Sequence, residues 1–264
     1  MTSLRFVQVD AFSELPFAGN PAAVMLLDNW LDDATLQLIA AENNLAETAF
    51  LVPLRTADAD YELRWFTPMI EVALCGHATL ASGHVLLSDH PARNTVRFAT
   101  RKSGALEVRR AGAGYALDLP ALPAAPRALS DIARLVGGEP SATLWRDGGY
   151  VVLVYPDEQA VRALRPDFAT LARGENLLIV ATAPGVDHDI VSRAFSPAAG
   201  IDEDPVTGTA HAVIMPYWAD RLGRSRLTAY QASSRGGRLV CTLAGDRVIL
   251  EGSCVTVIEG RFRL

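Results

Sequence analysis

The sequence has no excess of basic residues, no long apolar run and few cysteines. Lysine and arginine number 24 against 30 acidic residues, and the net charge of −6 speaks against a nucleic-acid or anionic-membrane partner, which would need a basic face. No apolar stretch reaches the length of about 18 residues that a membrane-spanning helix requires. Three cysteines, Cys75, Cys241 and Cys254, favour a reduced, cytoplasmic protein over a disulfide framework. We therefore expect a globular cytoplasmic protein.

Short strand-like segments dominate what is present. Those in the first quarter of the chain are rich in aromatic and β-branched residues and span residues 4–12, 22–27, 48–54 and 61–67. The first of them alternates and carries acidic residues early, so it indicates a strand and not a signal peptide. Helical patterns cover residues 32–44, 77–88, 129–137, 157–172 and 208–223. Long runs of strands with single intervening helices predict an α+β fold.

The two halves of the chain share a pattern. The segment "RWFTP" at 64–68 returns as "RAFSP" at 193–197, and each is followed by a glutamate and then by a glycine that opens an apolar helical pattern. A match at half-chain distance predicts two similar lobes. The Pro/Ala-rich stretch 118–131 marks the break between them. We predict an N-terminal lobe over 1–120, to which the C-terminal strand can return, and a C-terminal lobe over 121–264.

The repeated junction between loop and helix is the first candidate for a functional site. Amide groups in the first turn of a helix have no internal partner and carry the positive end of the dipole, so two such turns suit a carboxylate or a developing enolate. Most helix N-termini do no more than cap themselves. The matched positions here hold different polar residues, which favours function: Cys75, His77 and Thr79 in one copy, and Asp204, Thr207 and Thr209 in the other.

The polar residues at these junctions allow several interpretations. His77 at a helix N-terminus is expected to stay neutral, because the dipole disfavours its protonated form. The histidines show no spacing typical of zinc ligands, so we predict no metal site. Cys75 is either a reactive thiol, since a helix N-terminus lowers a thiol pKa, or a buried inert one. Its counterpart is Thr207, which disfavours a two-thiol racemase.

Three glutamates complete the set of candidates. Glu47 lies between the first helix and a strand, in an apolar run that suits a general base near neutral pH. Glu71 and Glu203 repeat between the halves, so we interpret them as structural residues that tie the loop before each helix.

Four separated motifs carry a family resemblance along essentially the whole chain. The segments "VDAFSELPFAGNPAAVML", "AETAFL", "LRWFTPMIEVALCGHATLASGHVL" and "RAFSPAAGIDEDPVTGTAHAVIMPYWADRLG" resemble the PhzF family of phenazine-biosynthesis-type isomerases. The resemblance implies a diaminopimelate epimerase-like fold of two pseudo-symmetric lobes, each a β-barrel around a central helix, with the active site between them. It also implies acid/base catalysis without a cofactor, and a homodimer.

The resemblance also implies roles for particular residues. Glu47 matches the general acid/base, and His77 and Asp204 match its partners in the site. Thr209 stands where the family often has serine, a mild replacement of one hydroxyl by another. Asn20, by its local pattern a residue of a plain turn, becomes a candidate substrate contact.

The leading hypothesis is a cofactor-independent isomerase that acts on a small carboxylate with an acidic C–H. Glu47 takes and returns the proton, His77 and Asp204 stabilise the developing charge, and the binding groups are Asn20, Gly76, Gly208 and Thr209. Two alternatives remain open. One is an epimerase or dehydratase in which Cys75 abstracts the proton. The other is a non-catalytic protein that binds a metabolite.

Overall fold

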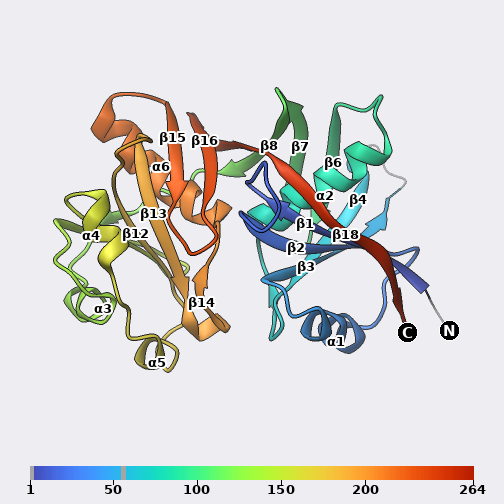
Figure 1. Ribbon diagram of the computed structural model, residues 1–264, viewed down its shortest axis with the longest axis horizontal. Helices are drawn as coiled ribbons and strands as arrows, with labels where there is room; N and C mark the ends of the chain where they lie inside the picture. Colours follow the sequence, from blue (N-terminus) through green and yellow to red (C-terminus); the bar gives the residue numbers. More distant parts are fainter. Residues whose placement is uncertain (1–2, 55–57) are drawn as a thin grey trace. The chain divides into compact units, whose positions relative to one another are not determined.

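A computed structural model describes residues 3–54 and 58–264 (Figure 1). Residues 1–2 and 55–57 of the predicted N-terminal lobe lie outside the described residues. Two compact units divide the chain: the first comprises residues up to Asp118 together with Glu251–Leu264, and the second comprises Leu119–Leu250. Within the described ranges, no helix is both long and apolar enough to cross a membrane.

The first unit is a curved mixed sheet around one helix. Its elements are β1 (Ser3–Ala11), β2 (Asn20–Leu26), α1 (Asp33–Asn43), β3 (Glu47–Pro53), β4 (Tyr61–Phe66), β5 (Glu71–Val72), α2 (Gly76–Asp89), β6 (Thr95–Thr100), β7 (Ala105–Ala111), β8 (Gly114–Pro120) and β18 (Cys254–Arg263). The strands pair in the order β18–β1–β2–β3–β4–β6–β7–β8, and β5 pairs with β4. The pairs β2–β3 and β4–β6 are parallel.

Helix α2 is the centre of this unit. It contacts β1, β2, β3, β6, β7 and β18, so strands from both ends of the pairing order surround it. Eleven of its fourteen residues are buried, as expected for a helix that is apolar all round. At Gly83 an added Cβ would meet Val108 at 2.3 Å, so the helix needs glycine to approach β7 this closely. Helix α1 contacts β3 and β4, and its apolar residues join a second core with Met25 and Phe50.

The second unit repeats this plan. Its elements are β9 (Ala125–Pro126), α3 (Ser130–Val136), β10 (Ala142–Arg146), β11 (Tyr150–Val154), α4 (Glu158–Ala163), α5 (Phe168–Leu171), β12 (Leu178–Pro184), β13 (Ile190–Ser196), the 3-10 helix η1 (Pro197–Ala199), β14 (Ile201–Asp204), α6 (Gly208–Leu222), β15 (Arg226–Gln231), β16 (Gly237–Ala244) and β17 (Arg247–Gly252). The strands pair in the order β9–β10–β11–β12–β13–β15–β16, with β14 on β13. Helix α6 contacts β11, β12 and β16.

The repeat predicted from the sequence is present in the strand pairing. Parallel β2–β3 corresponds to parallel β11–β12, and parallel β4–β6 corresponds to parallel β13–β15. In each unit the buried helix follows a short strand that pairs with the preceding long one. The two pseudo-symmetric lobes and the α+β class are therefore confirmed.

The loop before each buried helix is fixed by the same ion pair. Arg64 donates two hydrogen bonds to the carboxylate of Glu71, at 2.7 and 2.8 Å. Arg193 does the same to Glu203, at 2.8 and 2.9 Å. The structural interpretation of both glutamates is thus confirmed, since each ties the segment that leads into α2 or α6 to a neighbouring strand.

The sequence prediction was wrong in one helix. Residues 157–172 form two short helices, α4 and α5, and not one. Pro166 lies between them, where its ring and its missing N–H interrupt the helical hydrogen bonds. Asp157 and Asp167 each cap one of the two helices through a side-chain carboxylate.

Candidate active site

Three elements of the first unit bring the candidate residues together. Asn20 and Glu47 are the first residues of the parallel strands β2 and β3. Cys75 caps α2, and His77 lies in the first turn. Gly19, with φ +68°, positions Asn20, because an added Cβ there would meet the carbonyl oxygen of Ala11 at 2.2 Å. All four candidate side chains, Asn20, Glu47, Cys75 and His77, are buried.

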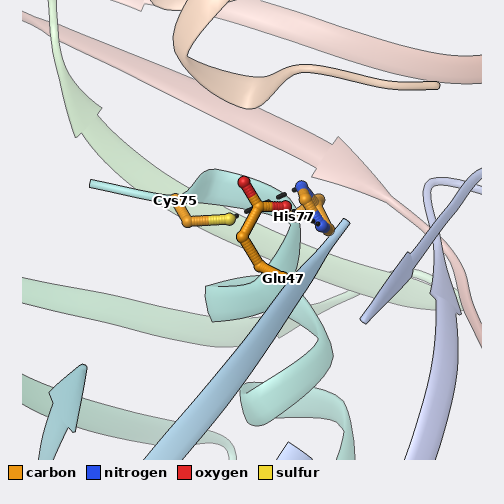
Figure 2. Close-up of side chains that lie close together, drawn as sticks. All are labelled: Glu47, Cys75 and His77. Atoms are coloured by element: carbon orange, nitrogen blue, oxygen red, sulfur yellow. Dashed lines mark hydrogen bonds and ion pairs between the residues drawn. The ribbon is translucent and has the colours of Figure 1, made fainter. Parts of the chain in front are cut away.

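The His77 imidazole is the centre of the group. The amide Nδ2 of Asn20 lies 3.0 Å from Nδ1 of His77, and the Cys75 thiol lies 3.5 Å from the same nitrogen. The other ring nitrogen, Nε2, is 3.1 Å from Oε2 of Glu47, although the two groups are not aligned for a hydrogen bond. Figure 2 shows the thiol, the carboxylate and the imidazole converging beside the first turn of α2.

These contacts favour one tautomer of neutral His77. When the Asn20 amide donates to it, Nδ1 accepts a hydrogen bond, and the proton of the neutral ring is on Nε2, facing Glu47.

The expectation that His77 resists protonation was wrong. Burial of the ring alone would lower its pKa, but negative charge at Cys75 and Glu47 raises the pKa well above its ordinary value. The contribution of Cys75 requires a thiolate, which its own raised pKa makes rare at pH 7.

Cys75 behaves as a buried thiol and not as a reactive one. Burial raises its pKa to about 11, and the nearby carboxylate of Glu47 acts in the same direction. These effects outweigh the dipole at the N-terminus of α2, where Cys75 makes no side-chain cap. The thiol is therefore almost fully protonated at pH 7.

Slow alkylation of Cys75 is the expected consequence. At pH 8 a thiol with a pKa of about 11 is roughly one part in a thousand thiolate, so iodoacetamide should react about a hundredfold more slowly than with an unperturbed cysteine. Because the pKa is raised, the rate should still climb about tenfold per pH unit between pH 8.5 and 9.5, where an ordinary thiol levels off. Peptide mapping by mass spectrometry, with the urea-unfolded chain as control, measures this. Rapid labelling of folded protein at pH 7 would contradict it.

The second unit holds the other predicted residues. Asp204 ends β14, Thr207 caps α6, and Gly208 and Thr209 begin its first turn. The hydroxyl of Thr207 donates to Oδ2 of Asp204 at 2.5 Å, and both side chains are buried. The structure thus brings Asp204 and Thr207 together in this unit, while Asn20, Glu47, Cys75 and His77 gather in the first.

Gln231, which sequence reasoning missed, fixes the segment 204–207. Its fully buried side chain accepts a hydrogen bond from the amide of Thr207 at 2.9 Å. It also donates to the carbonyl oxygen of Asp204 at 2.7 Å and to the hydroxyl of Thr207 at 3.1 Å. One side chain thus holds both ends of the turn that presents Asp204. A lone glutamine at the end of β15 gives no signal in the sequence.

The helix that follows this turn contains a second buried histidine. Nδ1 of His211 lies 2.8 Å from the carbonyl oxygen of Thr207, and Nε2 lies 3.5 Å from the hydroxyl of Ser192. Burial lowers the pKa of His211 to about 4, so this ring is neutral at pH 7 and supports the turn without carrying charge.

Replacing Gln231 with leucine should destabilise the second unit. The change keeps much of the volume but removes three hydrogen bonds and leaves the Thr207 amide buried without its acceptor, at an expected cost of about 2–4 kcal/mol. Gln37→Leu is the matched control, since Gln37 is only half-buried and its amide donates a single hydrogen bond, to the carbonyl of Thr67. Urea denaturation measures the free energy of unfolding of both variants. Equal losses of stability would show that the three buried hydrogen bonds of Gln231 contribute no more than the single hydrogen bond of Gln37.

Fold and site define a two-lobed α+β protein of the diaminopimelate epimerase-like class. The chain matches the phenazine biosynthesis-like protein family, PhzC-PhzF, over residues 9–260. It is 50% identical to an uncharacterized isomerase of Pseudomonas aeruginosa, over 99% of each chain. The crystal structure of a PhzF-family phenazine biosynthesis protein from Enterococcus faecalis superposes with a TM-score of 0.90 at 40% identity, over 100% of both chains.

A more distant likeness concerns the fold alone. A hydroxyproline epimerase from Agrobacterium vitis shares the architecture with a TM-score of 0.66 at 10% identity, over 98% of this chain and 92% of that one.

The chain belongs to the PhzC-PhzF family, as its motifs indicated. It is an enzyme of the isomerase class, because relatives that match it over their full length are isomerases.

Proposed function

We propose that the protein is a cofactor-independent isomerase that moves a proton within a small carboxylate substrate. The observation that supports this most strongly is the pairing of Glu47 with His77 in a buried setting. The Glu47 carboxyl group stands 3.1 Å from an imidazole whose other nitrogen is held by Asn20. Such a pair can take a proton from carbon and give it back, which is the work of a general acid and base.

In the proposed reaction Glu47 accepts the proton from an acidic C–H of the substrate. The electrons of the broken bond pass into the conjugated system next to the carboxylate. The proton on the Glu47 carboxyl group can exchange with solvent, and one proton is returned from this group to a different carbon. The reaction is balanced within one substrate molecule and uses no oxidant or second reactant. His77 and Asp204 donate or accept hydrogen bonds where charge develops.

The first turns of α2 and α6 support the binding part of the proposal. The amides of Gly76 and Gly208 lie where helical N–H groups lack an internal partner, and such groups bind carboxylates well. We assign carboxylate binding to the Gly76 amide in the first unit and to the Gly208 amide with the hydroxyl of Thr209 in the second, each taken by itself, and Asn20 to positioning His77 or the substrate.

A deuterium-exchange screen tests the proposed function. The protein is incubated in D2O with a panel of small carboxylic acids that carry an acidic C–H, and NMR follows loss of the proton signal. We expect exchange into a subset of acids with a double bond conjugated to the position that loses the proton. If at least one acid binds tightly and no acid of the panel exchanges, the result would favour the non-catalytic alternative.

One contact favours a second candidate function. The Cys75 thiol lies 3.5 Å from Nδ1 of His77, within reach for proton transfer, as an epimerase or dehydratase that uses this thiol would require. The raised pKa of Cys75 makes this candidate the weaker one. Cys75→Ala separates the two: exchange at an unchanged rate leaves Glu47 as the base, and loss of exchange in a folded variant selects the thiol.

A further inference from the structure

Glu47, Cys75 and His77 form a compact set of three donor atoms, hereafter the three-donor cluster. A carboxylate oxygen, the thiol sulfur and one ring nitrogen all lie within 4.8 Å of one another. The exposed fractions of the three residues are only 9%, 5% and 2%, so water competes little for these atoms. Figure 2 shows that the three side chains face a common point.

Two atoms of the cluster have no hydrogen-bond partner within the described part of the chain. Oε2 of Glu47 and Nε2 of His77 are both buried and face one another at 3.1 Å without the alignment of a hydrogen bond. Buried polar atoms in this condition are costly. A cation bound between a carboxylate oxygen and an imidazole nitrogen would satisfy both at once.

The donor types select among metal ions. Thiolate, imidazole and carboxylate are the three ligand types of protein zinc sites, whereas Mg²⁺ and Ca²⁺ require oxygen donors throughout. Tetrahedral zinc, with bonds of about 2.0–2.3 Å, places its donors roughly 3.3–3.6 Å apart. The thiol already lies 3.5 Å from Nδ1, whereas the Glu47 carboxylate contacts Nε2, so zinc at either nitrogen requires a shift of one of these side chains. The three donor atoms lie within 4.8 Å of one another, at most about 1–1.5 Å beyond the donor separations around bound zinc, so modest side-chain shifts would bring them onto one ion.

We propose that Zn²⁺ binds reversibly at the three-donor cluster and inhibits the enzyme. Bonds form from zinc to the sulfur, to one imidazole nitrogen and to a Glu47 oxygen, the S–H bond of Cys75 breaks, and its proton leaves to solvent. No oxidation is involved, and water completes the coordination. Binding rests on the donor set alone. Inhibition rests on the proposed function, since zinc would occupy the oxygen with which Glu47 accepts the substrate proton.

Cobalt(II) is the probe that tests the site without any substrate. A thiolate bound to Co²⁺ gives an intense near-ultraviolet charge-transfer band that carboxylate and imidazole ligands do not give. We expect this band to saturate at one equivalent of Co²⁺ in the wild-type protein and to vanish when Zn²⁺ is added. It should be absent in Cys75→Ser and in Cys75→Ala, the second variant guarding against misfolding of the first. Cys241→Ser, at another buried thiol, is the matched control and should keep the band.

The inhibition is tested separately, with the acid that the exchange screen identifies. Stoichiometric Zn²⁺ should stop exchange in the wild-type protein, and EDTA should restore it. The exchange that Cys75→Ser shows without metal should need at least about tenfold more Zn²⁺ for the same fractional inhibition.

Each failure has a distinct meaning. Absence of the charge-transfer band, or its persistence without Cys75, overturns the metal site. A normal band with full exchange in saturating Zn²⁺ overturns the inhibition. Failure of the proposed function itself appears elsewhere, as undiminished exchange in Glu47→Gln without metal.

Discussion

Replacing Glu47 with glutamine should reduce solvent deuterium exchange into the substrate at least about a hundredfold. The amide keeps the shape of the carboxylate at the start of β3 but cannot accept a proton from carbon. General acid/base catalysis contributes about 10²–10⁴-fold to enzymatic rates, and the loss should fall in that range. The effect should lie in the rate of the chemical step more than in substrate binding, because the neighbours Asn20 and His77 keep their places.

Glu42→Gln provides the matched control for this experiment. Glu42 lies five residues upstream on α1, is exposed, and takes no part in the proposed chemistry. The Glu42→Gln variant should therefore exchange the substrate proton at the rate of the wild-type protein. Thermal unfolding of both variants verifies that the fold is retained. Exchange at the wild-type rate in Glu47→Gln would remove Glu47 as the base and direct attention to Cys75.

The repeat was the most informative feature of the sequence. Matching "RWFTP" with "RAFSP" predicted two similar lobes, and the strand pairing of β4–β6 and β13–β15 has the same parallel geometry. The pattern also identified Glu71 and Glu203 as structural before any partner was known. Local patterns of this kind can be recognised in a sequence because the residues involved lie close together along the chain.

Contacts between segments that are distant in the chain could not be predicted from the sequence. Gln231 reaches Asp204 and Thr207 only because β15 pairs in parallel with β13, and this pairing joins segments that are far apart in the sequence. The approach of Cys75 and Glu47 to the two nitrogens of one imidazole likewise depends on how β3 lies against α2. The protonation of His77 was wrongly expected from the helix dipole alone, because the neighbouring carboxylate came from a different element.

The ion pair between the buried Arg64 and Glu71 offers a large expected effect on stability. Arg64 is 1% exposed, donates to Asp33 at 2.9 Å as well as to Glu71, and lies over the ring of Phe66. Removing one partner of a buried pair costs about 3–5 kcal/mol, because the other charge remains without compensation. Since the side chain of Glu71 is 27% exposed, we expect Arg64→Met to cost about 2–4 kcal/mol in urea denaturation.

A double-mutant cycle distinguishes the ion pair from the packing of the arginine stem. Replacing both partners, in Arg64→Met with Glu71→Met, leaves no unpaired charge from this pair, so the double variant should be more stable than the two single losses predict. The coupling should exceed about 1 kcal/mol. It should also diminish on acidification, because the hydrogen bonds from Arg64 lower the pKa of Glu71. A group with a lowered folded pKa stabilises the fold above its unfolded pKa, and this stability is lost as the pH falls through the folded value.

The chain supplies both a repetition and a control for this cycle. Arg193 and Glu203 form the same pair before α6, and Arg193 also donates to the carbonyl oxygen of Leu164 at 3.0 Å. Arg193→Met should therefore cost at least as much as Arg64→Met, because a backbone acceptor is left unpaired as well. The exposed pair of Arg97 with Glu107, at 57% and 39% exposure, should show a coupling below about 1 kcal/mol. Equal coupling in the buried and exposed pairs would mean that the repeated arginines stabilise the lobes through packing and not through charge.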